Sequence, residues 1–176
     1  MKRRLIVVAA LGLGLGAVFG VATMLVAREN FRDTFSAIQS ICLIVATAIL
    51  AVRYYRKGCD SVAAGFLLYA IGEAVTFSGA AAGVSASVTS LGVCTALWAV
   101  SLLLISLPAE FPFPVRLTGI MSSILFFITA LGIFWGEHLP SFMSPFPFFA
   151  YPLLILTFFG WIWSLLNELR VNQGKV

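Results

Sequence analysis

The sequence predicts an all-α, polytopic integral membrane protein: a bundle of six transmembrane helices with both termini in the cytoplasm. Of its 176 residues 61% are hydrophobic and 10% are charged, and the mean hydropathy is +1.04. Soluble domains carry about 25% charged residues. The apolar residues fall into six runs, each close to the roughly 20 residues that span a hydrocarbon core of about 30 Å. Lysines and arginines gather between alternate runs, so we expect one transmembrane domain over residues 1–176.

The first helix is expected over residues 5–27, after a basic N-terminal segment. This run is longer than the 7–15 apolar residues of a signal peptide, which predicts a retained helix. Gly12, Gly16 and Gly20 follow one another at GxxxG spacing, a pattern typical of close helix packing. The second helix is expected over residues 34–52, before a basic segment whose tyrosines suit the headgroup interface.

The third helix is expected over residues 61–80, and Asp60 and Ser61 can each cap its start. Gly65, Gly72 and Gly79 recur every seven residues along it, which predicts a second face for close packing. Glu73 is the one ionisable acid or base inside this run.

The last three helices are expected over residues 88–107, 116–135 and 148–166. The proline-rich segment 108–114 separates the first two of these, because proline removes a backbone donor and clashes with the preceding turn. The irregular segment 136–147 separates the last two and contains Glu137 and the sole histidine, His138. We interpret this acid–imidazole pair as solvated loop surface rather than a ligand site.

The distribution of basic residues predicts the orientation of the bundle. With six helices both termini lie on one side, and that side holds nine of the eleven lysines and arginines. The other side holds Arg28 and Arg32. By the positive-inside rule both termini are cytoplasmic, and we expect the protein in a bacterial cytoplasmic (inner) membrane.

Glu73 is the centre of the predicted ligand- or proton-binding site. A charge at the bilayer centre costs about 2.5–3.5 kcal/mol or more, so this side chain is expected to face the bundle interior. Small or hydroxyl residues occur at a similar depth in the other helices. The predicted site comprises Glu73, Tyr69, Thr76, Gln39, Ser40, Thr95, Thr129 and Thr157. The alternative is that these hydroxyl groups bond their own helix backbone and that Glu73 only ties two helices together.

Signals for catalysis and for cofactors are lacking. There is no intramembrane Ser/His pair, no GxSxG and no HExxH motif. Cys42, Cys59 and Cys94 form no CxxC pair and are interpreted as packing residues. A single loop histidine does not serve a membrane-buried haem, and no lysine lies inside an apolar run. We therefore expect no cofactor and no metal site, and the pattern leans away from an enzyme.

Two functional hypotheses follow from the sequence, and a lipid-modifying enzyme is a third, weaker one. The first is a small transport or ligand-binding protein that takes a proton or a small cationic or polar substrate at Glu73. The second is a non-catalytic accessory or assembly subunit of a larger membrane complex. In that case a partner subunit or a second copy would pack on the glycine faces formed by Gly12, Gly16, Gly20, Gly65, Gly72 and Gly79. Membrane lipid is an expected partner and nucleic acid is not, because the basic clusters adjoin the apolar runs.

Overall fold

The computed structural model describes residues 3–81, 84–135 and 145–173 as six α-helices and their short connections. The helices are α1 (Arg3–Leu25), α2 (Glu29–Arg56), α3 (Asp60–Ala81), α4 (Val84–Ser106), α5 (Phe113–Phe134) and α6 (Pro145–Gln173). Each is long and apolar enough to cross a membrane, which confirms the six predicted helices. Glu137 and His138 lie outside the described residues.

Two helices extend well beyond their apolar runs. α2 begins at Glu29 instead of near residue 34, and α6 spans Pro145–Gln173 instead of residues 148–166. Charged residues end an apolar run but do not end a helix, since only residues such as glycine and proline oppose helical geometry strongly. The hydrophobic pattern therefore marks the part of each helix that suits hydrocarbon and misses its polar ends.

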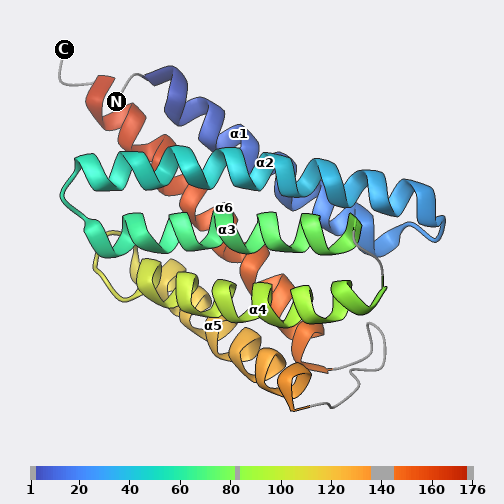
Figure 1. Ribbon diagram of the computed structural model, residues 1–176. Coiled ribbons are helices and arrows are strands. Elements are labelled where there is room, and N and C mark those ends of the chain that lie inside the picture. Colours follow the sequence, from blue (N-terminus) through green and yellow to red (C-terminus); the bar gives the residue numbers. More distant parts are fainter. Residues whose placement is uncertain (1–2, 82–83, 136–144, 174–176) are drawn as a thin grey trace.

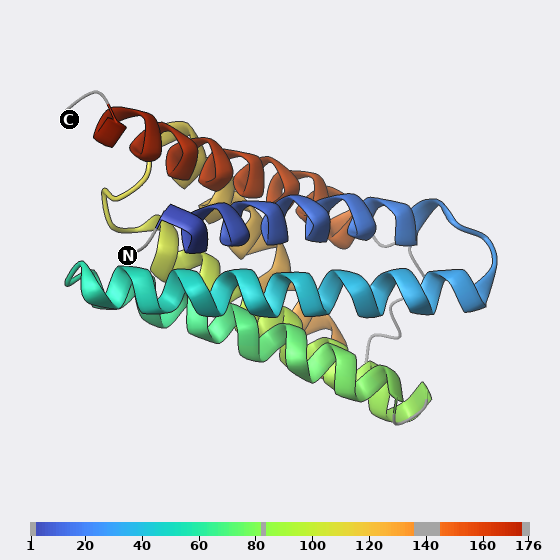
Figure 2. The same cartoon turned by 90° about the horizontal axis from the view of Figure 1, so that it is seen from above.

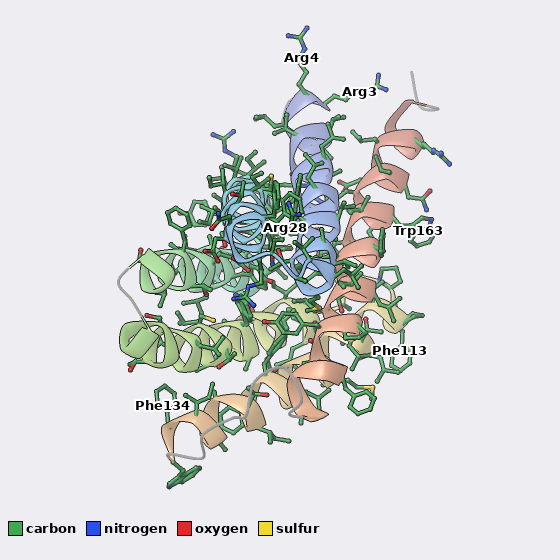
Figure 3. The ribbon with its side chains drawn as sticks, turned by 90° about the vertical axis from the view of Figure 1, so that its right-hand side faces the viewer. Arg3, Arg4, Arg28, Phe113, Phe134 and Trp163 are labelled. Atoms are coloured by element: carbon green, nitrogen blue, oxygen red, sulfur yellow. The ribbon has the colours of Figure 1, made fainter. Side chains whose placement is uncertain are left out.

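The six helices form a closed ring. Each one packs against its neighbours in the sequence, and α6 returns to contact α1, the least extensive of the six contacts. Figures 1 and 2 show both termini at the same end of the bundle, together with the α2–α3 and α4–α5 connections. The α1–α2 connection lies at the opposite end. Figure 3 looks along the bundle from that opposite end, and its labelled aromatic residues Phe113, Phe134 and Trp163 lie on the outside.

Glycines bring neighbouring helices close together within the chain. A methyl group placed on Gly12 of α1 would lie 3.0 Å from the carbonyl oxygen of Cys42 on α2. One placed on Gly65 of α3 would lie 2.8 Å from the carbonyl oxygen of Ser101 on α4. Gly72 approaches the indole of Trp98 on α4 in the same way. The predicted close contacts of these three glycines are therefore confirmed, and each is made inside the bundle.

Aromatic side chains fill the centre of the ring in the half that holds the termini. Tyr54 stacks on Phe66 at 5.5 Å between ring centroids, and Phe66 meets Trp161 at 4.9 Å. Trp161 contacts Phe158 at 5.5 Å, and Phe158 contacts Tyr69 at 5.8 Å. Such offset and edge-to-face pairs add roughly 0.5–1.5 kcal/mol each beyond their buried area. We call this series of rings, from Tyr54 to Tyr69, the aromatic column.

Charged side chains tie the helices together at the end of the bundle that holds the termini. Arg53 of α2 is buried and forms an ion pair with Glu168 of α6 at 2.5 Å, and Lys57 contacts the other oxygen of Glu168 at 2.9 Å. The guanidinium group of Arg116 donates hydrogen bonds of 2.7 and 2.8 Å to two carbonyl oxygens at the C-terminal end of α4. The contact between α2 and α6 joins two helices that are distant in the sequence, so the hydrophobic pattern could not predict it.

Candidate ligand-binding site

Glu73 lies in the interior of the bundle, as predicted. It sits on the α3 face that meets α2, and only 1% of the residue is exposed. The hydroxyl group of Ser40 on α2 donates a hydrogen bond of 3.1 Å to Oε2 of Glu73. The second carboxyl oxygen, Oε1, is buried and has no hydrogen-bond partner among the described residues. Buried polar atoms are nearly always paired, so an unpaired carboxyl oxygen calls for a functional explanation.

A cavity of about 180 Å³ adjoins this carboxyl group. Its walls come from five of the six helices, in the half of the bundle away from the termini. The lining residues are Gly16, Ala17, Gly20, Thr23, Met24, Ser36, Gln39, Ser40, Glu73, Thr76, Trp98, Tyr151, Leu154, Ile155 and Phe158.

Small residues of α1 line this cavity. Gly16 and Gly20 both border it, and Gly20 faces the side-chain amide of Gln39 on α2. A methyl group on Gly16 would meet the side chain of Leu43 on α2, so this glycine allows α1 to pack closely on α2. The predicted packing role of Gly16 and Gly20 is therefore confirmed, and both residues also lie at the wall of the cavity beside Glu73.

Two more polar groups near Glu73 are buried without a partner in the part of the chain that the structure describes. These are the hydroxyl group of Tyr69 and the Nε1 atom of Trp98, and the two rings stack at 5.8 Å between centroids. The Tyr69 hydroxyl lies close to the Glu73 carboxyl group, one helical turn away, without the geometry of a hydrogen bond. Two donors and one carboxyl oxygen are thus concentrated in one region with unused hydrogen-bonding capacity.

The structure brings together half of the predicted site. Glu73, Gln39, Ser40 and Thr76 line the cavity, and Tyr69 lies directly behind it. The hydroxyl group of Thr76 bonds the carbonyl oxygen of Gly72 in its own helix.

Thr95, Thr129 and Thr157 do not line the cavity. Each donates a hydrogen bond of 2.8 or 2.9 Å to a carbonyl oxygen four residues earlier in its own helix. Thr157 also contacts the hydroxyl group of Thr118 on α5. Equal depth in the membrane does not place two residues on facing sides of their helices, and for these three the local backbone bond is the arrangement that the structure shows.

The aromatic wall of the cavity was missed in the sequence. Trp98 of α4 and Tyr151 of α6 both line it, with their rings 6.3 Å apart. The search by depth considered small and hydroxyl residues, so these aromatic side chains received no weight. The pairing of α6 with α1 was also not predictable from the order of the helices.

The described residues hold no cluster of three or more His, Cys, Asp or Glu side chains that could bind a metal ion. The three cysteines are free thiols, and Cys94 is buried in the core beside Trp98. The chemistry available at the site is therefore that of one buried carboxyl group. Such a group can exchange a proton, accept hydrogen bonds or balance a bound positive charge.

These features define a six-helix membrane bundle with a carboxyl-lined cavity in one half. No family model matches the chain, and no curated protein or solved structure shows significant similarity to it. The geometry around Glu73 is therefore the feature of the molecule that bears on its function.

Proposed function

We propose that this chain is a small membrane transport or ligand-binding protein in which Glu73 takes up a proton or a small cationic or polar ligand. The observation that carries the proposal is the unpaired Oε1 of a fully buried carboxyl group beside a cavity of about 180 Å³. Ionisable residues at membrane depth are expensive and usually mark a pathway or a binding site. The carboxyl group needs either a proton or a cation to offset the cost of burying its charge.

The shape of the bundle supports a transport role. The cavity occupies the half away from the termini. The aromatic column, whose Phe158 borders the cavity, and the Arg53–Glu168 ion pair lie between the cavity and the end that holds the termini. Alternating access requires a state in which one side of the site is densely packed and the other side contains a cavity, and this bundle has that arrangement. The uneven distribution of basic residues favours cytoplasmic termini, so the cavity would lie toward the outside of the cytoplasmic membrane.

The accessory-subunit hypothesis has less support after the glycine contacts are considered. Gly12, Gly65 and Gly72 pack against helices of the same chain, so a partner would need other surfaces. The experiment below distinguishes the transport role from this accessory-subunit hypothesis.

Proton flux into reconstituted vesicles tests the proposal. Vesicles holding a pH-sensitive dye are given an inside-negative potential, and the wild-type protein is expected to acidify their interior faster than empty vesicles. Glu73→Gln, which keeps the size and a hydrogen-bonding group but cannot ionise, should reduce the rate to that of empty vesicles. Glu110→Gln is the matched control, because Glu110 is an exposed carboxyl group in the α4–α5 connection. Equal rates for Glu73→Gln and the wild type would overturn the transport role.

A further inference from the structure

The walls of the Glu73 cavity divide by chemistry, and the division indicates a class of ligand. The polar side chains come from the α1–α3 side, where Ser36, Gln39 and Ser40 accompany Glu73. The opposite side, from α4 and α6, carries rings and aliphatic groups. A ligand that fits both walls has one polar end and one carbon-rich end.

The polar end should carry a positive charge. Among the described residues that line the cavity, Glu73 is the one carboxyl group, and none is a lysine, arginine or histidine. The buried Arg53 at the other end of the bundle is already paired with Glu168. An anionic ligand would therefore meet like charge at Glu73, whereas a cation would supply the counter-charge that a buried carboxylate needs.

The carbon-rich end should be small and suited to aromatic rings. Trp98, Tyr151 and Phe158 line this side, and cations bearing alkyl groups are attracted to the faces of such rings. The cavity has a volume of about 180 Å³. This volume lies well below the roughly 300–1,000 Å³ of pockets for drug-sized molecules.

We infer that the Glu73 cavity binds a small alkylammonium ion. Its charged nitrogen lies beside the carboxyl group, and the methylene group bonded to that nitrogen, which shares the positive charge, contacts the ring of Tyr151. A divalent metal ion is the less suitable cation, since the described residues offer no cluster of acidic, histidine or cysteine ligands. This inference rests on the proposed function and specifies the ligand of the same site.

Thermal unfolding of the purified protein in detergent tests the inference with n-propylammonium chloride as the probe. A ligand that binds only the folded state raises the unfolding temperature progressively with its concentration. The wild type should be stabilised by n-propylammonium, and not by equal concentrations of sodium chloride, sodium propionate or propan-1-ol. These three test ionic strength, an anion of similar shape and a neutral molecule of similar shape. Equal stabilisation by propan-1-ol or by propionate would overturn the assignment of a cation.

Variants locate the binding site and its aromatic component. Glu73→Gln should abolish the shift, and Glu110→Gln should retain it. Tyr151→Leu, which removes the ring, should weaken binding about 2- to 30-fold, the range expected for a lost cation–π contact. Tyr151→Phe keeps the ring and should bind n-propylammonium as the wild type does. Unchanged affinity in Tyr151→Leu would overturn the role of the aromatic wall. The affinities of Tyr151→Leu and Tyr151→Phe are compared directly, provided that both variants fold.

The outcomes separate this inference from the proposed function. Glu73-dependent proton flux without stabilisation by n-propylammonium would leave the function standing and reject the ligand class. Absence of both would reject both. Stabilisation that depends on Glu73 and Tyr151 supports the alkylammonium site whichever rate the flux assay gives.

Discussion

Ser40 and Glu73 are joined across the α2–α3 interface by a hydrogen bond of 3.1 Å that engages one carboxyl oxygen, while the other has no partner among the described residues. This arrangement positions the carboxyl group without satisfying it. A purely structural carboxyl group would be expected to engage both oxygens, because each unpaired buried polar atom costs free energy. The Ser40 hydroxyl therefore positions the Glu73 carboxyl group, and the second carboxyl oxygen stays available to a proton or a ligand.

Ser40→Ala should lower the free energy of unfolding by about 0.6–2 kcal/mol, since it leaves both carboxyl oxygens of Glu73 unpaired. Ser164→Ala is the matched control, because that hydroxyl bonds only the backbone of its own helix and its loss should cost less than about 0.5 kcal/mol. Chemical unfolding of both variants in detergent gives the comparison. Equal stabilities of the two variants would mean that the Ser40 bond contributes nothing.

Gly72→Leu should destabilise the protein by about 1–3 kcal/mol, because the added side chain meets the indole of Trp98 and the Cβ of Leu97. Ala64→Leu adds a similar volume on the exposed face of the same helix and should leave stability nearly unchanged. Unfolding temperatures of the two variants separate internal packing from the lipid-facing surface. A Gly72→Leu protein as stable as Ala64→Leu would contradict the close α3–α4 contact.

The sequence was sufficient to predict the number of helices and the burial of Glu73, but not the polar ends of the helices or the residues that line the cavity. Six apolar runs and the cost of charge in hydrocarbon placed Glu73 inside a bundle, and the glycine spacing indicated the close faces of α1 and α3. Which residue faces which depends on helix rotation and on ring closure between α6 and α1. Neither leaves a periodic signal when most of each helix is apolar, so Trp98 and Tyr151 were missed.

The same limit explains the three threonines that do not line the cavity. Their depth in the membrane is similar to that of Glu73, but depth does not determine the direction in which a side chain points. The three residues are Thr95, Thr129 and Thr157. The ion pair between Arg53 and Glu168 was not predictable for a similar reason. Glu168 lies beyond residue 166, where the last helix was expected to end, and only the longer helix α6 carries it to Arg53.

Glu168→Gln should weaken the closed end of the bundle, since it removes the partner of the buried Arg53 guanidinium group. Glu168 is 37% exposed, so water screens the pair and a loss of about 1 kcal/mol is expected rather than the larger cost of a fully buried pair. Lys57→Gln removes the more exposed of the two cations and should cost less. Unfolding in detergent at low and at high salt provides the measurement. A salt-independent loss that is equal in both variants would contradict this account.

The orientation of the bundle can be tested with single cysteines in a variant whose three native cysteines are replaced. A cysteine at Asn30, in the first turn of α2, should react with a membrane-impermeant maleimide added to whole cells. One at Ala109, in the connection between α4 and α5, should react only after the cells are opened. Both positions are exposed in the structure, so a difference in labelling reports the side of the membrane. The reverse pattern would place the termini outside.

Replacing Glu73 with an apolar residue distinguishes a functional carboxyl group from a structural one. Glu73→Leu removes a buried group with an unpaired oxygen, and the freed Ser40 hydroxyl can bond a carbonyl oxygen of its own helix, as several hydroxyl groups here do. If the carboxyl group is retained for function, this variant should be as stable as the wild type or up to about 2 kcal/mol more stable, because functional groups are often kept at a cost in stability. It should nevertheless lose proton flux, as Glu73→Gln should. If Glu73 instead only joins α2 to α3, Glu73→Leu should unfold more easily than Glu73→Gln, which can still accept the Ser40 hydrogen bond. Measuring flux and unfolding on the same two preparations decides between these cases, since a destabilised Leu variant beside a fully active Gln variant would make Glu73 a structural residue.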